Sequence, residues 1–528
     1  MDKEDFKFMK PGEVRVRIAP SPTGFMHVGL ARTALFNYLF AKKHNGVFVL
    51  RIEDTDAERS DPKFEKDITE TLKWLGVEWD EGPDIGGPYG PYRQSERGEI
   101  YKKYLENLIK EGKAYYCFCS EEELESQRQY FLSIGQPPIY NGKCRNLDEK
   151  TVKKYLKEGK KAIIRFKTPT KKIKFNDLVK GEIEFDTSLI GDFSIAKDLT
   201  SPLYNFAVVI DDFEMKISHV LRGEEHISNT PKQILLQEAL GFPSPQYGHL
   251  PLILGPDRSK LSKRHGAVAV SEYKRQGYLP EAIINFIAFL GWNPGTEREI
   301  YSLPALIKDF SIERIQKSGA VFNIKRLDFL NGFYIRQKPT DKLTQLCLPY
   351  LIEKKLIERV SETSEKFKII ETREIVDINY LEKIVKIYQE RLKKLSELPE
   401  LTDFFFKEKL EFDKNLLKWR NMTDKEVKQA LDKLEKVLSK IKENLWNREY
   451  LEKVLLEEAE NFVREIGRVG ELASGKTEPV KRIDRGYFLW PLRVALSGKE
   501  ASAGPFEIAE ILGKEKTLKR IKEAKKKL

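Results

Sequence analysis

The N-terminal part of the chain alternates between short apolar runs and stretches with helical spacing. Residues 14–19 (VRVRIA) and 46–52 (GVFVLRI) are predicted strands, and residues 30–44 and 63–75 are predicted helices. Strand, helix, strand is the opening of a parallel α/β sheet, whose ligands bind beyond the carboxyl ends of the strands. We therefore expect a ligand site at the loop PSPTG, after the first strand, and at the acidic run EDTD, after the second.

The pattern changes between about residues 113 and 199. A group of cysteines is followed by short β-like pieces at 162–166 and 183–185, which indicates a domain inserted into the α/β core. After it, the apolar run 204–210 (YNFAVVI) is a predicted strand. A strand is also expected at 219–221, a helix over 230–240, and a strand ending at residue 254.

From about residue 279 the chain is predicted to be largely helical, including the Lys/Glu-rich stretch 424–443. The tail, 514–528, is a predicted basic helix, which fits a solvated face as well as an RNA contact. The expected fold class is α/β, with a Rossmann-like parallel-sheet core, an inserted α+β domain and an all-α C-terminal domain. The expected divisions are 12–112 and 201–262 for the two halves of the core, 113–200 for the insertion, and 263–340 and 341–528 for two helical domains.

Composition narrows the class of protein without identifying an activity. The 528 residues include 40% hydrophobic and 33% charged residues, which is typical of a globular protein with several domains. No apolar run reaches the roughly 20 residues of a membrane span, and the acidic N-terminus has no signal-peptide core, so a cytoplasmic protein without a membrane partner is expected. The net charge of +11 favours a polyanionic partner, although many Lys-rich proteins bind no nucleic acid.

Two short motifs on either side of the insertion suit a nucleotide. His27 and Gly29 open a predicted helix after a Pro/Gly loop, where free backbone N–H groups and partial positive charge favour phosphate. Lys260 and Lys263 lie in the basic loop KLSKR, which could close over a triphosphate and offset charge on a departing pyrophosphate. Each motif alone is common in proteins; their order around an insertion is far more specific.

Together with the segments around them, these motifs resemble those of the bacterial glutamyl-tRNA synthetases, a family of class I aminoacyl-tRNA synthetases. The resemblance rests on APSPTGFMHVGLARTALFNYLF and KLSKR as the two class I signatures, and on YNFAVVIDDFEMKISHVLRGEEHISNTPKQ between them. The segment LWPLRVALSGKEASAGPFEIAEILGKEKTLKRI resembles the closing segment of the family. The resemblance covers nearly the whole chain. It implies that 113–200 binds the tRNA acceptor stem, that 263–340 contacts the tRNA stem, and that 341–528 binds the anticodon.

The resemblance also implies the reaction, its substrates and its site residues. ATP and Mg²⁺ would activate L-glutamate, which would then be transferred to tRNA(Glu), and the family expectation is a monomer. His27, Gly29, Glu225, Lys260 and Lys263 would approach ATP, with His27 and Lys263 steadying its phosphates. The glutamate pocket would be formed by Arg17, Ser21, Glu53, Tyr204 and Arg222. Two arginines suit two carboxylates, and an acid suits the ammonium group.

The cysteine group could bind structural zinc (Zn²⁺). Cys117, Cys119 and Cys144 supply three of the four ligands that zinc needs, and the family pattern adds Tyr140. A second family pattern needs a His where this chain has Asn146. Three buried free thiols remain the alternative.

Other functions stay open at this stage. The chain could be a catalytically inactive tRNA-binding or regulatory paralogue, or it could also glutamylate tRNA(Gln). A truncated paralogue that glutamylates a tRNA base would lack the C-terminal region, and a glutaminyl-tRNA synthetase would be richer in strands there. The segment GELASGKT, 470–477, fits a phosphate-binding loop by letter alone, because it follows a helix-like stretch instead of a strand.

Overall fold

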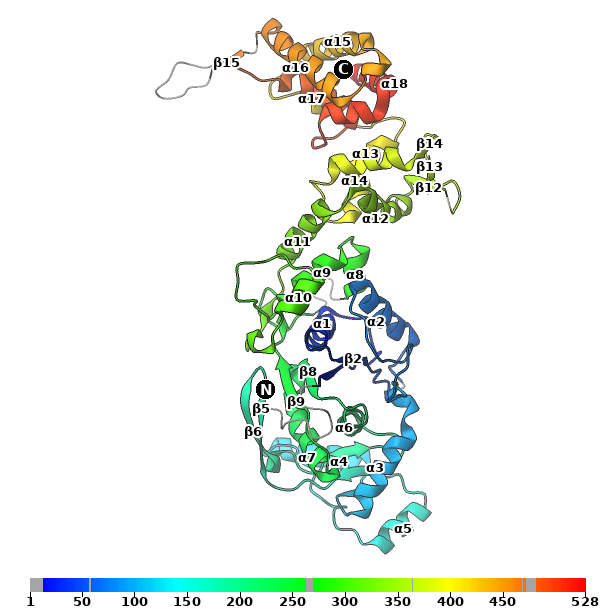
Figure 1. Cartoon of the computed structure of the whole chain (residues 1–528), viewed down its shortest axis with the longest axis vertical. Coiled ribbons are helices and arrows are strands. Elements are labelled where there is room, and N and C mark those ends of the chain that lie inside the picture. The colour runs from blue at the N-terminus through cyan, green and yellow to red at the C-terminus, as the bar shows by residue number, and fades with distance from the viewer. Residues whose placement is uncertain (1–12, 57, 263–268, 363, 468, 472–480) are drawn as a thin grey trace. The chain divides into compact units, whose positions relative to one another are not determined.

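The computed structural model describes residues 13–56, 58–262, 269–362, 364–467, 469–471 and 481–528. The chain divides into two compact units, Met1–Leu330 and Asn331–Leu528, and the division falls within helix α11 (Ile324–Gln337). Figure 1 labels most of the helices and some of the strands of both units. Among the described residues, no helix combines the length and the apolar character that a membrane crossing requires.

Two pairs of parallel strands form the centre of the first unit. Strand β1 pairs with β2 from Arg15↔Val47 to Ile18↔Leu50, and β8 pairs with β9 in the same sense. The Ser218 N–H donates to the Arg15 carbonyl (2.9 Å), which places the start of β8 beside β1. The elements of this core are β1 (Arg15–Ile18), α1 (Val28–Lys43), β2 (Val47–Leu50), α2 (Pro62–Leu75), α6 (Tyr204–Glu214), β8 (His219–Gly223), α7 (Thr230–Leu240) and β9 (Gln246–Leu250). The predicted parallel α/β core is confirmed.

Helix α6 corrects one prediction. The run YNFAVVI, predicted to be a strand, forms the first two turns of α6. Every residue from Phe206 to Ile210 is apolar and buried, so this stretch has no polar positions to give it helical periodicity. A short continuous apolar run fits a buried strand and a buried helix equally well, and only the tertiary packing distinguishes them.

The segment between the two halves of the core is the predicted mixture of helices and strands. It contains an antiparallel sheet β3-β4-β7 and a hairpin of β5 and β6. The elements are α3 (Gly98–Lys110), β3 (Ala114–Cys117), α4 (Glu121–Ser133), α5 (Glu149–Lys157), β4 (Ile163–Phe166), β5 (Lys172–Asp177), β6 (Gly181–Asp186) and β7 (Ser194–Ala196). No residue of α4 or α5 is buried, so both helices lie on the surface of the unit.

The first unit ends in helices that cover the core. Helix α9 is mostly buried and shares one hydrophobic core with α1, β1 and β2. The remaining elements are β10 (Ile253–Leu254), α8 (Val270–Arg275), α9 (Pro280–Ala288), α10 (Leu303–Asp309) and β11 (Ala320–Val321). These helices agree with the largely helical character expected after residue 279.

The second unit is mainly helical but contains strands that the sequence analysis missed. Its elements are α12 (Thr340–Glu353), β12 (Ile357–Arg359), β13 (Lys366–Ile369), β14 (Ile375–Asp377), α13 (Ile378–Tyr388), α14 (Leu398–Thr402), α15 (Asp424–Lys440), α16 (Arg448–Glu465), β15 (Val469–Glu471), β16 (Lys481–Ile483), α17 (Gly486–Ser497) and α18 (Pro505–Lys525). Strands β12, β13 and β14 form a small antiparallel sheet. They have three or four residues each and many charges, so they carry little period-2 signal. Residues 472–480, which include the last six residues of the GELASGKT segment, lie outside the described part.

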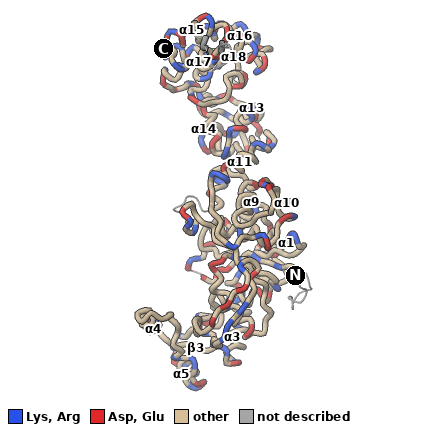
Figure 2. Tube along the Cα trace, turned by 90° about the vertical axis from the view of Figure 1, so that its left-hand side faces the viewer, with Lys and Arg blue, Asp and Glu red and all other residues tan. Residues whose placement is uncertain are grey.

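The basic C-terminal tail forms most of α18, as predicted. Figure 2 shows basic and acidic residues interspersed along the helices of this unit. Lys525 pairs with Asp432 and with Glu435 (2.8 Å), and Lys519 pairs with Glu408. At these positions the lysines neutralise acids of the same unit, which fits the solvated-face interpretation of the tail.

Candidate active site

The first motif lies at the N-terminus of α1. His27 is the N-cap residue, and its Nδ1 accepts a hydrogen bond from the Leu30 N–H (3.1 Å). A Cβ atom at position 29 would lie 3.1 Å from the His27 Nδ1, tighter than ordinary van der Waals contact. Gly29 therefore leaves room for the imidazole to fold over the first turn. The arrangement keeps the helix N-terminus accessible, and such a terminus attracts anions.

The lysine loop begins beside β10 and ends beside Met26, the residue before His27. Lys260 forms an antiparallel bridge with Leu254, and the Leu261 N–H donates to the Ile253 carbonyl (2.9 Å). After the loop, the Val270 N–H donates to the Met26 carbonyl (2.8 Å). Lys263 lies outside the described residues. The segment that follows the lysine loop is thus joined by backbone pairing to Met26 and His27, more than two hundred residues earlier in the sequence.

Charge at the His27 side chain reflects this arrangement. The protein packed around one side of the imidazole desolvates it and lowers the pKa of His27. The carboxylate of Glu225 opposes this shift, and the ammonium of Lys260 adds to it. His27 is therefore neutral at pH 7 and lies within electrostatic reach of Glu225 and Lys260, two other residues of the predicted ATP-binding set.

Arg17 lies on β1 within a buried charge cluster. Its guanidinium donates to the two carboxylate oxygens of Asp212 at 3.0 and 3.4 Å. Asp212 also accepts from Arg51 (2.7 Å), and Arg51 donates to Glu53 (2.9 Å). Arg51 is fully buried, and Arg17 is 4% exposed. Buried charges are stable in a protein only when they are paired in this way.

Glu53 follows β2 and comes close to the PSPTG loop. Burial raises the pKa of Glu53, while the positive charges of Arg51 and Arg17 lower it and only partly offset the burial. Its backbone N–H donates to the Pro20 carbonyl (2.9 Å), which places Glu53 beside the exposed Ser21. The carboxyl ends of β1 and β2 therefore bring together the two segments predicted to share a site.

Arg222 and Tyr204 complete this group from the second half of the core. Burial raises the pKa of the Tyr204 hydroxyl, and the charges of Arg222, Glu53 and Arg17 also act on it. Arg222 is 5% exposed, and its Nη1 has no hydrogen-bond partner among the described residues. A buried guanidinium nitrogen without a partner is costly, and a carboxylate is the ligand that satisfies it best.

Several residues of the site were missed by sequence reasoning. Asp212 and Arg51 hold Arg17 and Glu53, and His249 and Thr230 hold Arg222. The sequence offered one signal for Arg51. It lies at the end of an apolar strand, where an arginine needs a buried partner. Asp212, His249 and Thr230 carry no comparable signal, since each is distant in sequence from the residues it contacts.

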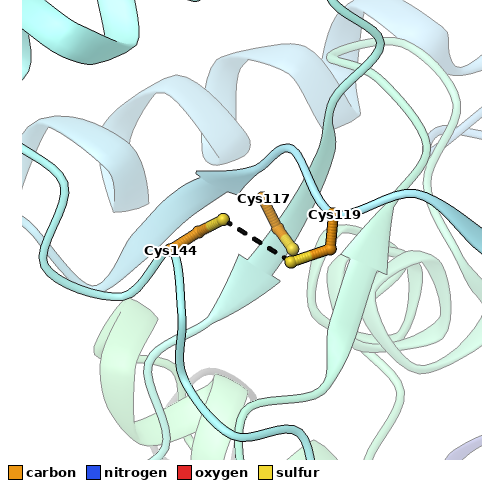
Figure 3. Close-up of side chains that lie close together, drawn as sticks. All are labelled: Cys117, Cys119 and Cys144. Atoms are coloured by element: carbon orange, nitrogen blue, oxygen red, sulfur yellow. Dashed lines mark hydrogen bonds between the residues drawn. The ribbon is translucent and has the colours of Figure 1, made fainter. Parts of the chain in front are cut away.

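The cysteine group has the geometry of a metal site. The sulfur atoms of Cys117, Cys119 and Cys144 lie within 4.8 Å of one another, and Figure 3 shows the three side chains converging from β3 and two loops. The Cys119 and Cys144 sulfurs are 3.8 Å apart, and the Tyr140 hydroxyl is 3.5 Å from the sulfurs of both Cys117 and Cys119. In tetrahedral zinc, bonds of about 2.3 Å to sulfur and about 2.0 Å to oxygen separate two sulfurs by about 3.8 Å, and a sulfur and an oxygen by about 3.5 Å. These three distances match tetrahedral zinc, so the four residues are compatible with a zinc site.

Comparison with known proteins identifies the family. Residues 13–329 match the family described as tRNA synthetases class I (E and Q), catalytic domain. Residues 342–472 and 480–525 match the family described as anticodon binding domain. The first match includes both nucleotide motifs, the charge cluster and the cysteine group.

Similar proteins agree over nearly the full length. The chain is 48% identical to glutamate–tRNA ligase 1 of Caldicellulosiruptor saccharolyticus over 96% of this chain and 98% of that protein. It is 47% identical to the glutamate–tRNA ligase of Carboxydothermus hydrogenoformans, over 96% and 99% of the two chains. The crystal structure of a glutamate tRNA ligase from Elizabethkingia meningosepticum in complex with its amino acid has a TM-score of 0.82 and 34% identity, covering 98% of this chain and 100% of that one. The chain therefore belongs to the glutamate–tRNA ligase family of class I aminoacyl-tRNA synthetases.

Proposed function

We propose that this chain is a glutamate–tRNA ligase that activates L-glutamate with ATP and transfers it to the terminal adenosine of tRNA(Glu). The observation that carries the proposal is the grouping of Arg17, Glu53, Tyr204 and Arg222 in one charged cluster. Glu225 acts electrostatically both on this cluster, through His226, and on His27. Two guanidinium groups with one carboxylate match a substrate that has two carboxylates and one ammonium group. Arg222 favours glutamate over glutamine, since an amide gains less from a guanidinium.

In the activation step, the α-carboxylate of glutamate attacks the α-phosphorus of ATP in line with the departing pyrophosphate. The attacking group is already an anion, so no protein base is needed. The rate enhancement then comes from positioning and from stabilising charge. His27 and Gly29 receive the nucleotide at the α1 terminus, Lys260 and Lys263 offset the phosphate charge, and Glu225 approaches the nucleotide. Mg²⁺ would accompany ATP and neutralise phosphate charge.

In the transfer step, the 2′-hydroxyl of the terminal adenosine attacks the carbonyl carbon of the glutamyl-adenylate and displaces AMP, as class I membership implies. We propose that 113–200 receives the acceptor stem, that 263–340 contacts the tRNA stem and that 341–528 reads the anticodon. Zinc bound by Cys117, Cys119, Tyr140 and Cys144 would stabilise the fold of the first of these regions. The protein is proposed to act as a cytoplasmic monomer.

The test is ATP–pyrophosphate exchange and aminoacylation with purified protein, L-glutamate and tRNA(Glu). The tRNA belongs in both assays because relatives often need it for activation. Glutamate-dependent exchange and charging are expected, and the absence of both would favour the catalytically inactive tRNA-binding paralogue. Parallel charging of tRNA(Gln) determines whether the enzyme has a wider tRNA range.

Arg222→Ala tests the amino-acid pocket. The KM for glutamate should rise at least tenfold while the KM for ATP stays within about twofold, because a charged hydrogen bond is worth about 1.5–3 kcal/mol. An unchanged KM for glutamate would remove Arg222 from the pocket.

A further inference from the structure

Arg222 is held by a chain of buried hydrogen bonds that begins in the inserted segment. Asp177, the last residue of β5, is 2.5 Å from the Nδ1 of His249 on β9. On the other side of the ring, the His249 Nε2 is 3.2 Å from the Nε of Arg222. His249 is fully buried, and Asp177 and Arg222 are 2% and 5% exposed.

The hydrogen-bonding chemistry of Asp177 and Arg222 fixes the tautomer of the His249 imidazole. An ionised carboxylate only accepts hydrogen bonds, so the Nδ1 of His249 must carry the proton that it shares with Asp177. A guanidinium only donates, so the His249 Nε2 must offer a lone pair to Arg222. One neutral tautomer satisfies both partners, whereas an imidazolium would place a second positive charge against the guanidinium.

The ionisation of both groups agrees with this tautomer. Burial lowers the pKa of His249, which keeps the imidazole neutral. Burial raises the pKa of Asp177, but hydrogen bonds from His249 and from the backbone N–H groups of Lys180 and Val179 outweigh it, so the pKa of Asp177 is lowered. The other charged neighbours that act on His249 are Arg222 and Lys180.

Further contacts restrict the guanidinium and the strand beneath it. The Arg222 Nη2 donates to the Thr230 hydroxyl (2.8 Å), and the guanidinium lies over the Tyr247 ring at 5.4 Å. The Leu178 N–H donates to the Tyr247 carbonyl (2.8 Å), which ties the end of β5 to β9. Of the three guanidinium nitrogens, Nε and Nη2 are engaged by the protein, while Nη1 has no partner among the described residues.

We propose that Asp177 and His249 are positioning residues for glutamate, which act by holding Arg222 with its remaining nitrogen directed to a substrate carboxylate. The inference rests on the proposed function and extends it, because it makes the β5–β6 hairpin of the inserted segment part of the glutamate pocket. A preorganised guanidinium loses less conformational entropy on binding than a mobile one.

A matched pair of substitutions at His249 separates positioning from general stability. The amide of a glutamine reaches the place of Nε2 and can accept from Arg222, whereas the amide of an asparagine reaches only the place of Nδ1. His249→Asn should therefore raise the KM for glutamate tenfold or more, and His249→Gln by about threefold. In both variants the KM for ATP should change less than twofold and kcat less than the KM for glutamate.

Asp177 is tested through His249. Asp177→Asn lets the amide donate to Nδ1, which favours the tautomer with a proton on Nε2 and turns that proton toward Arg222. The KM for glutamate should rise about fivefold in the otherwise unchanged enzyme and less than twofold in a His249→Gln background. An equal rise in both backgrounds would mean that Asp177 does not act through His249.

His219→Gln provides the control for folding. His219 is also fully buried and lies on the neighbouring strand β8, with its Nδ1 2.8 Å from the Ser218 hydroxyl. The His219→Gln substitution should lower the thermal stability without a selective effect on the KM for glutamate. If His249→Asn and His249→Gln behave alike, or if neither changes the KM for glutamate selectively, the positioning role is overturned. If the unmodified protein charges no tRNA with glutamate, the proposed function fails, and this inference fails with it.

Discussion

The buried carboxylate of Asp212 offers a quantitative test of how the proposed glutamate pocket is held together. Asp212 accepts from Arg17 at 3.0 Å and from Arg51 at 2.7 Å, and the three side chains are 8%, 4% and 0% exposed. Asp212→Asn keeps the shape and one acceptor but removes the negative charge between two guanidinium groups. Removing one partner of a buried ion pair costs about 3–5 kcal/mol. Since the amide still accepts one hydrogen bond, we expect a loss of about 3 kcal/mol in the free energy of unfolding of the first unit.

The same substitution should weaken glutamate binding. Arg17 keeps at most one of its two hydrogen bonds to this side chain and loses the opposing charge, so the KM for glutamate should rise about tenfold or more, with a smaller change in the KM for ATP. Asp211→Asn is the matched control, because the neighbouring carboxylate is also buried but accepts from Arg97 (2.7 Å), Gln94 (2.8 Å) and Tyr101 (3.0 Å), and its contact with Arg51 is longer, at 3.8 Å. It should destabilise the unit to a similar extent and leave the KM for glutamate within about twofold.

Stability can be assigned to the correct unit by hydrogen exchange of peptides that cover β1 and α6, combined with guanidinium denaturation. The pH dependence of the free energy of unfolding provides a second test of the Asp212 carboxylate. The ion pairs outweigh burial and lower the pKa of Asp212 in the folded protein. Its stabilising contribution is therefore complete above the unfolded value of about 3.9 and is lost as the pH falls through the lower folded value. A loss below 1 kcal/mol, or equal KM effects for Asp212→Asn and Asp211→Asn, would refute the reasoning.

Three further outcomes are expected. Lys263→Ala should reduce the rate of glutamate activation by at least a hundredfold while weakening ATP binding less than tenfold; equal losses in a pyrophosphate-exchange assay would make Lys263 a simple binding contact. The purified protein should contain about one zinc per chain by mass spectrometry of metals, and Cys144→Ser should lower that content and the thermal stability together; full stability without metal would favour three free thiols. Burial lowers the pKa of His219 to about 3, so the free energy of unfolding should fall as the pH drops from about 6.5 toward 3, and His219→Gln should flatten that slope in acid-titrated denaturation curves.

The sequence by itself determined the fold class, the two nucleotide motifs and the type of chemistry. Local patterns of apolar residues predicted β1, α1, β2 and α2, and His27 with Lys260 predicted a phosphate site because each motif is short and contiguous. Predictions from local sequence patterns failed where complete burial or a short, charged strand removes the periodic pattern. The first half of helix α6 shows no helical periodicity because Phe206–Ile210 are all apolar and all buried, and β12, β13 and β14 are too short and too charged to show alternation.

Only the tertiary structure decided which residues support the site. Asp212 follows Arg17 by 195 positions, and Asp177 precedes His249 by 72, so no spacing along the chain links either pair. These partners are required because a guanidinium in a low-dielectric interior must have its charge balanced and its donors satisfied. The sequence could predict that Arg17 and Arg222 would hold two carboxylates. The folded chain decides how firmly they are held, because the residues that hold them come together only when strands distant in sequence pack side by side.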